Sequence, residues 1–90
     1  MDELKVNPHV VLQSMGEGSL LMNTESADCF ELNRVGRDVW IELELGKTIP
    51  EIADVIVNRY AVDHVTAVAD VTLLIAALTG HGILVRKSAT

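Results

Sequence analysis

The stretch from His64 to Thr79 constrains this chain most, because it reads as one helix that is apolar almost all round. One stripe at helical spacing is enough to hold it on a core: Val71, Leu74, Ile75 and Leu78. A second surface is also apolar or small: Val65, Val68, Ala69, Thr72, Leu73 and Ala76. In a chain of 90 residues, such a helix is either covered by the other elements or presents one face to a partner. The residues leave both alternatives open.

Length and composition indicate one domain over residues 1–90, ordered over about 8–86, with an aliphatic core. Apolar residues make up 49% of the chain, and its only aromatic residues are Phe30, Trp40 and Tyr60. A formal net charge of −6 repels phosphate and anionic lipid, so neither nucleic acid nor a membrane is expected as a partner. The single cysteine, Cys29, and the lack of a signal peptide or a long apolar run predict a soluble cytoplasmic protein.

Three short stretches with strand character precede the helices and are joined by short turns. They cover about 9–15, 19–23 and 28–32. We predict an antiparallel meander whose edges are the first and third strands. In the third strand, Phe30 and Leu32 point to one face, and Cys29 and Glu31 point to the other. On spacing alone, this strand is either an ordinary sheet edge or an edge kept available for a partner.

Capping signals predict three helices after the strands. Asn33 caps about Arg34–Leu45, Thr48 and Glu51 form a capping box for a helix to Tyr60, and Asp63 caps His64–Thr79. Residues 83–85 favour another short strand, whereas 1–8 and 86–90 are expected to be a loose lead-in and a frayed tail. Glu42 and Glu44 are expected on a solvated helix face. The predicted fold class is α+β and winged helix-turn-helix-like, a three-stranded antiparallel meander followed by three helices.

The third helix argues against the DNA-binding function of many such folds, because it contains no Lys or Arg for phosphates or base edges. The histidines His9, His64 and His81 have no metal-ligand spacing. No base stands beside Cys29 in the sequence, and no glycine-rich phosphate loop opens a helix. We therefore expect no catalytic residue, no metal and no cofactor.

Short motifs along most of the chain resemble the PqqD-like family. They are Phe30-Glu31-Leu32-Asn33, Gly36 with Val39-Trp40, Gly46-Lys47-Thr48-Ile49, and the closing run from Val71 through Leu78 to Gly82-Ile83-Leu84. The resemblance covers roughly residues 8–86. It implies a peptide recognition element, which binds the leader segment of a ribosomally made precursor peptide and delivers it to modifying enzymes without catalysis.

The resemblance also implies where the leader binds. In such domains the leader adds as a strand to the third strand of the meander, in a groove walled by the third helix. Carried onto this chain, the docking edge is Ala27, Asp28, Cys29, Phe30 and Glu31. The helix wall is drawn from Val65, Val68, Ala69, Thr72, Leu73 and Ala76. Arg34 and Arg37, just past the strand, either meet acidic leader residues or are ordinary surface charges.

Two pathways fit the resemblance. One is lasso-peptide biosynthesis, with a cysteine-protease leader peptidase and an ATP-dependent cyclase as partners. The other is a radical-SAM pathway such as pyrroloquinoline quinone synthesis. We favour the lasso pathway. A winged-helix DNA-binding protein and a structural homodimer that buries the apolar helix face remain as alternatives from other classes.

Overall fold

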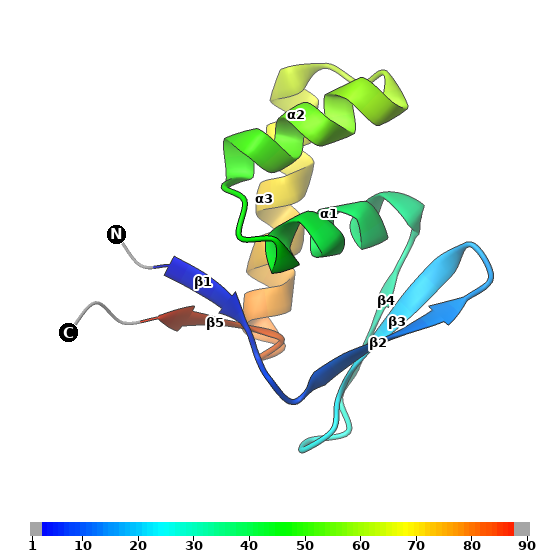
Figure 1. Cartoon of the computed structure of the whole chain (residues 1–90), viewed down its shortest axis with the longest axis vertical. Coiled ribbons are helices and arrows are strands. Elements are labelled where there is room, and N and C mark those ends of the chain that lie inside the picture. Colours follow the sequence, from blue (N-terminus) through cyan, green and yellow to red (C-terminus); the bar gives the residue numbers. More distant parts are fainter. Residues whose placement is uncertain (1–2, 88–90) are drawn as a thin grey trace.

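The computed structural model describes residues 3–87, which form two small sheets and three helices (Figure 1). In chain order the elements are β1 (Glu3–Val6), β2 (Val10–Met15), β3 (Gly18–Asn23), β4 (Cys29–Leu32), α1 (Arg34–Glu44), α2 (Ile49–Tyr60), α3 (His64–Gly80) and β5 (Leu84–Lys87). Figure 1 shows α1 between the β2–β4 sheet and the pair formed by β1 and β5, with α2 packed across one end of α3. The predicted α+β class, a three-stranded antiparallel meander followed by three helices, is confirmed.

The meander has the strand order β2-β3-β4, so β2 and β4 are its edges as predicted. A two-residue turn joins β2 to β3, and its first residue, Gly16, has φ +64°. This backbone conformation suits the right-handed twist of a hairpin and favours glycine. Phe30 is half-buried and Leu32 is buried, whereas Cys29 and Glu31 are exposed, which confirms the predicted alternation.

The helices begin where their capping residues predict. The side chain of Asn33 accepts a hydrogen bond from the Gly36 N–H at 2.8 Å. Thr48 and Glu51 form the complete capping box of α2, and the Asp63 carboxylate accepts from the Thr66 N–H at 2.7 Å. Each cap satisfies N–H groups that have no partner inside the helix, so local sequence determines these boundaries.

A hydrogen bond and an ion pair, together called the polar bracket, join Asp38 of α1 to the end of α2. The Tyr60 hydroxyl donates a hydrogen bond to Asp38 Oδ2, and Arg59 Nη1 lies 3.4 Å from Asp38 Oδ1. The hydrogen bond to the Asp38 carboxylate is the main cause that raises the pKa of the Tyr60 hydroxyl. The bracket fixes how α2 is rotated against α1, because both partners of Asp38 come from the last turn of α2.

The core is aliphatic except for Trp40, which is 1% exposed. Its buried members come from both sheets and all three helices: Leu21, Leu32, Val39, Trp40, Ile52, Ala53, Ile56, Ala67, Val71, Ile75, Leu78, Ile83 and Leu84. Of the stripe predicted to hold α3 on the core, Val71, Ile75 and Leu78 are buried and Leu74 is half-buried. One face of α3 therefore supports the core, and the opposite face is exposed.

The N-terminal residues are more ordered than predicted. The expectation of a loose lead-in over 1–8 is wrong, because Glu3–Val6 forms β1 and pairs antiparallel with β5. The expectation of a frayed tail is wrong for residues 86 and 87, which belong to β5, while 88–90 lie outside the described residues. The two strands lie at opposite ends of the chain, so no local pattern in the sequence indicates their pairing.

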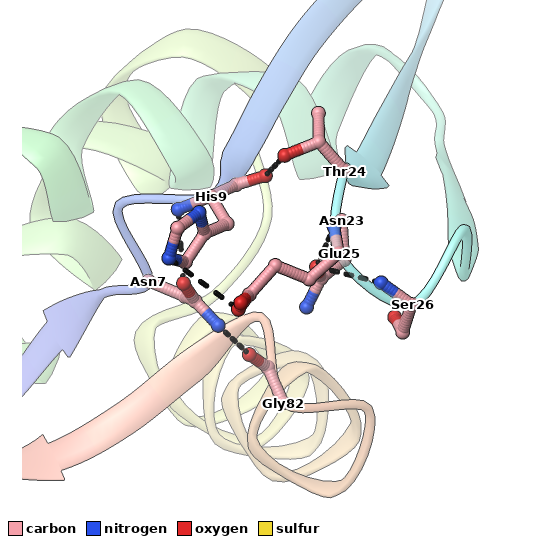
Figure 2. Close-up of polar contacts among 7 residues, drawn as sticks. All are labelled: Asn7, His9, Asn23, Thr24, Glu25, Ser26 and Gly82. Carbon is pink, nitrogen blue, oxygen red and sulfur yellow. Dashed lines mark hydrogen bonds and ion pairs between the residues drawn. The ribbon is translucent and has the colours of Figure 1, made fainter.

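Hydrogen bonds tie this β1–β5 ribbon to the meander (Figure 2). Asn7 Nδ2 donates to the Gly82 carbonyl at 3.0 Å, and Asn7 Oδ1 accepts from the His9 N–H at 2.9 Å. The His9 carbonyl in turn accepts from both the N–H and the hydroxyl of Thr24, at 2.8 and 2.9 Å. The turn before β4 is thereby connected through Asn7 to the turn after α3.

A second correction concerns Glu42, for which the sequence predicts a solvated face shared with Glu44. Glu42 is only 5% exposed, and its Oε2 lies 2.6 Å from Lys47 Nζ. The ion pair compensates the cost of burying the carboxylate and links the end of α1 to the loop before α2. Glu44 is exposed, as predicted.

Candidate functional site

The outer edge of β4 is open, because within residues 3–87 this strand pairs with β3 alone. In their antiparallel register, Met22 lies opposite Cys29 and Leu21 opposite Phe30. The N–H of Asn23 bonds to the carbonyl of Asp28 at 2.9 Å. Bonded and non-bonded pairs alternate along an antiparallel ladder. Phe30 and Leu32 therefore direct their backbone groups to β3, and Cys29 and Glu31 direct theirs to the open edge.

This open edge is short. At its start, Ala27 has φ +63° and its N–H bonds to the Asn23 carbonyl at 2.8 Å, so Ala27 is a turn residue. At its end, Asn33 already caps α1. Of the five predicted docking residues, Cys29, Phe30 and Glu31 lie in β4, and Ala27 and Asp28 precede it. The edge thus offers the two N–H and two C=O groups of Cys29 and Glu31 to a guest strand.

A pocket of about 350 Å³ lies beside this edge, between β4, α1 and α3. We call it the β4–α3 groove. It is lined by Glu31, Leu32, Asn33, Val35, Gly36, Val39, Ile56, Asp70, Val71 and Leu74. Its volume is at the low end of ligand pockets, roughly 300–1,000 Å³, which suits one or two amino-acid side chains. The groove is apolar inside, and Glu31 and Asp70 are its only charged lining residues.

The helix wall of the groove differs from the one the resemblance implied. Its α3 residues are Asp70, Val71 and Leu74, and none of the six expected residues lines it. Five of those six lie on exposed parts of α3: Val65, Ala69, Thr72, Leu73 and Ala76. Val68 is half-buried and packs against the core. The expected edge and the expected helix face therefore do not meet at this groove.

Sequence reasoning misses Asp70, Val71 and Leu74 because both faces of α3 are apolar, and spacing alone assigns the stripe that includes Val71 and Leu74 wholly to the core. One signal in the sequence distinguishes the groove side. Asp70 is the only acidic residue within α3, which contains no Lys or Arg. A charged side chain next to a core stripe marks where that stripe reaches the surface.

Gly36 allows α1 to lie close to β4 at the floor of the groove. A Cβ atom at this position would lie 3.2 Å from Leu32 Cδ2 and 3.3 Å from Asn33 Oδ1. Both distances are tighter than ordinary van der Waals contact. Glycine in the first turn of α1 thus permits this close approach, and a Cβ here would require the Leu32 and Asn33 side chains to shift by a few tenths of an ångström.

A wider depression of about 750 Å³ continues past the end of β4 toward the β2–β3 turn. It shares Glu31, Leu32, Asn33 and Val35 with the β4–α3 groove. Arg34 lines it, and Arg34 Nη2 lies 3.1 Å from Glu17 Oε1. Arg37 lines neither pocket and is half-buried in α1. The two arginines are therefore not placed together, and only Arg34 lies near the open edge of β4.

The chemistry available at this site is recognition of an extended chain. The groove lining consists mainly of alkyl side chains, with Gly36, the Asn33 amide and two carboxylates, and none of its residues is a histidine, cysteine or lysine. Within residues 3–87, no three His, Cys, Asp or Glu side chains group as metal ligands. In the same part of the chain, no helix is both long and apolar enough to cross a membrane.

Comparisons with known proteins identify the family and the fold. The family model described as coenzyme PQQ synthesis protein D (PqqD) matches residues 18–84. A solved structure described as TbiB1 in complex with the TbiA(beta) leader peptide is 31% identical, with a TM-score of 0.81. The similarity covers 89% of this chain and 93% of that chain.

A second solved structure has the same fold with lower identity. It is described as lasso peptide synthetase B1 complexed with the leader peptide, and it is 20% identical with a TM-score of 0.84. The similarity covers 92% of this chain and 98% of that chain. Curated protein sequences yielded no match. Because the family model spans well over half of the sequence, this chain belongs to the PqqD family.

Proposed function

We propose that this protein binds the leader segment of a ribosomally made precursor peptide and delivers it to modifying enzymes, without catalysing a reaction itself. The observation that carries the proposal is the open edge of β4 beside an apolar groove. The two solved structures similar to this chain are both described as leader-peptide complexes, which supports it.

Strand addition would divide recognition between two parts of the site. Backbone groups of Cys29 and Glu31 would give the guest its register and a sequence-tolerant share of the affinity. The β4–α3 groove would select one or two side chains, because alternate residues of the guest point toward Val71 and Leu74. A disordered leader loses entropy when it orders, so moderate affinity and ready release are expected.

We propose a lasso-peptide pathway first, in which the leader is passed to a protease and a cyclase. The structural similarity to a protein described as lasso peptide synthetase B1 favours this pathway. A radical-SAM pathway such as pyrroloquinoline quinone synthesis is the second candidate, and the description of the matching family model favours that one. Reconstitution with the enzymes encoded beside this gene distinguishes the two, since only the correct enzyme should process its precursor faster when this protein is added.

Amide hydrogen exchange tests the binding mode directly. The probes are synthetic peptides that cover the N-terminal part of each short open reading frame next to this gene. We expect one peptide to bind saturably and to protect the amides of Cys29 and Glu31. The amides of Phe30 and Leu32 should be protected already without peptide, because they face β3. Saturable binding without new protection at 29 and 31 would disprove strand addition at β4.

A proline substitution in β4 tests the same binding mode by mutation. Cys29→Pro removes an N–H that faces the guest and leaves the ladder to β3 intact, because proline is tolerated on an edge strand. We expect it to lower peptide affinity, whereas Cys29→Ala should not. Phe30→Pro, which removes an N–H that faces β3, should instead destabilise the fold. Equal affinities for Cys29→Pro and Cys29→Ala would contradict the proposal.

Sedimentation addresses the remaining structural alternative. A homodimer that buries the exposed face of α3 should resist dilution and should not change when leader peptide is added. A peptide-binding protein should instead show a sedimenting mass that increases with peptide concentration until one peptide is bound.

A further inference from the structure

The carboxylates of residues 5–85 fall into groups with different surroundings. Some lie within 3.4 Å of a basic side chain: Glu17, Glu25, Asp38, Glu42 and Asp54. Two cap helices, namely Glu51 and Asp63. Those with neither a cap nor an ion pair within residues 5–85 are Asp28, Glu31, Glu44 and Asp70. Two of these four, Glu31 and Asp70, line the β4–α3 groove, and Asp28 immediately precedes β4.

No basic side chain lines the β4–α3 groove to neutralise this charge. Of the two arginines that follow β4, Arg34 pairs with Glu17 and Arg37 lines neither pocket. The chain as a whole carries a formal charge of −6, so its long-range field also favours a cationic guest. The groove is thus apolar within and negative at its rim.

Resting on the proposed function, we propose that the guest peptide carries a lysine or arginine next to the apolar residue that it inserts in the groove, and that Asp70 is the residue that selects this cation. Lysine and arginine have alkyl stems that can lie along Leu74 while the charged head reaches the carboxylate. An acidic guest residue at the same place would face an unpaired carboxylate and be rejected.

The strand geometry extends the inference to the outer face of the guest. Successive side chains of a strand point to opposite faces. A guest residue adjacent to the apolar residue in the groove, which we call the anchor, therefore points away from α3. There it would stand across from Cys29 or Glu31, whose side chains are exposed on that face. A second basic residue at this neighbouring position would form a cross-strand pair with Glu31. The site should therefore prefer basic guest residues beside the anchor and reject acidic ones.

Peptide selection tests the inference and does not require the natural precursor. A display library of random twelve-residue peptides is selected against the wild-type protein, against Asp70→Asn and against Glu44→Gln. Glu44 is the matched control, because it is an exposed, unpaired carboxylate that lines neither pocket. We expect wild type and Glu44→Gln to enrich Lys or Arg at one fixed distance from an apolar residue, and Asp70→Asn to lose this enrichment.

Affinities of individual peptides then measure the effect. Replacing the enriched Lys by norleucine should weaken binding to wild type roughly three- to fivefold, the size of an exposed ion pair, and should not weaken binding to Asp70→Asn. The difference should shrink at high ionic strength. Selection of peptides without a basic preference, or a preference that survives in Asp70→Asn, would overturn the inference.

The same experiment separates this inference from the proposed function. Selected peptides are also measured on Cys29→Pro and Cys29→Ala. Peptides that lose affinity only for Cys29→Pro bind at the β4 edge, and their sequences then decide the role of Asp70. If no peptide is selected, or if all selected peptides bind Cys29→Pro as well as wild type, the proposed function fails and the inference fails with it.

Discussion

The imidazole of His81 meets the ring of Phe30 edge-on, with the ring centroids 5.3 Å apart and the planes inclined by 67°. Phe30 lies in β4, and His81 caps the C-terminal end of α3. The contact links β4 to the C-terminal end of α3. It also keeps Phe30 on the inner face of the sheet, so that the backbone of Cys29 and Glu31 remains on the outer edge.

Phe30→Ala should therefore affect both stability and binding. The ring is half-buried, so its loss should reduce the free energy of unfolding by roughly 1–2 kcal/mol. Peptide affinity should also fall, because β4 is then held less firmly against α3. His81→Ala is the control, since it removes the edge contact but little buried area, and it should cost roughly 0.5 kcal/mol. Urea denaturation of the three proteins measures both values, and equal midpoints would refute the expectation.

Leu73 and Leu74 are adjacent in α3 but have different surroundings. Leu74 lines the β4–α3 groove and packs on the core, whereas Leu73 is 70% exposed and lines neither pocket. We expect Leu74→Ala to weaken peptide binding and to lower the free energy of unfolding by about 1–2 kcal/mol. Leu73→Ala should leave both within experimental error. Calorimetric titration of a bound peptide would show which helix face forms the wall, and the opposite ranking would favour the face that contains Leu73.

Asn7 should contribute to stability although it lies near the N-terminus. Its side chain bonds both to the Gly82 carbonyl and to the His9 N–H, and so joins the β1–β5 ribbon to the meander. Asn7→Ala should lower the free energy of unfolding by about 1–2 kcal/mol, the value of one or two such hydrogen bonds. Asn58→Ala, on the exposed face of α2, is a matched control that should change little. Thermal unfolding followed by circular dichroism would measure the difference.

The caps of α2 and α3 should make stability depend on acid pH. Hydrogen bonds from Thr66, through its side chain and its backbone N–H, lower the pKa of Asp63 below its ordinary value of 3.8. Hydrogen bonds from Thr48, led by its backbone N–H, lower the pKa of Glu51 below 4.5. A lowered pKa in the folded state means that the charged carboxylate stabilises the fold above its unfolded pKa, and that this contribution is lost as the pH falls through the folded pKa.

Asp63→Asn separates capping from titration, because asparagine caps a helix but carries no charge. At pH 7 the variant should be nearly as stable as wild type. Below about pH 4 the wild type should lose stability faster than the variant, since only Asp63 becomes protonated. Chemical denaturation at a series of pH values from neutral down to about pH 2.5 would give the free energy of unfolding of both proteins against pH. Parallel curves would contradict the role given to Asp63.

Local patterns were sufficient for most of the elements. Asn33, Thr48 and Asp63 cap the helices that follow them, and Gly16 stands in the predicted hairpin turn. These predictions hold because a cap or a tight turn is decided by a few neighbouring residues, whose hydrogen bonds close within one turn of chain. The alternation within β4 is local for the same reason, because side chains of a strand change faces at every residue.

The helix wall could not be predicted in the same way. An apolar pattern shows which residues of α3 avoid water but not which neighbour covers each of them, and α3 is apolar on both faces. The pairing of β1 with β5 and the burial of Glu42 beside Lys47 depend likewise on segments that meet only after folding. The strand pairing and the buried ion pair join segments that are separate in the chain, so no local pattern indicates them. For α3, the local sequence offers only the lone charge of Asp70 as a sign of the groove side.

The sequence by itself therefore determined the order and approximate boundaries of the central strands and helices, and it placed β4 at an edge of the meander. Only the tertiary structure decided which side of α3 stands beside that edge. The physical reason is the rotation of α3 about its axis, which packing against α2 and β5 sets. That rotation brings Asp70, Val71 and Leu74 to the groove and leaves Leu73 in solvent.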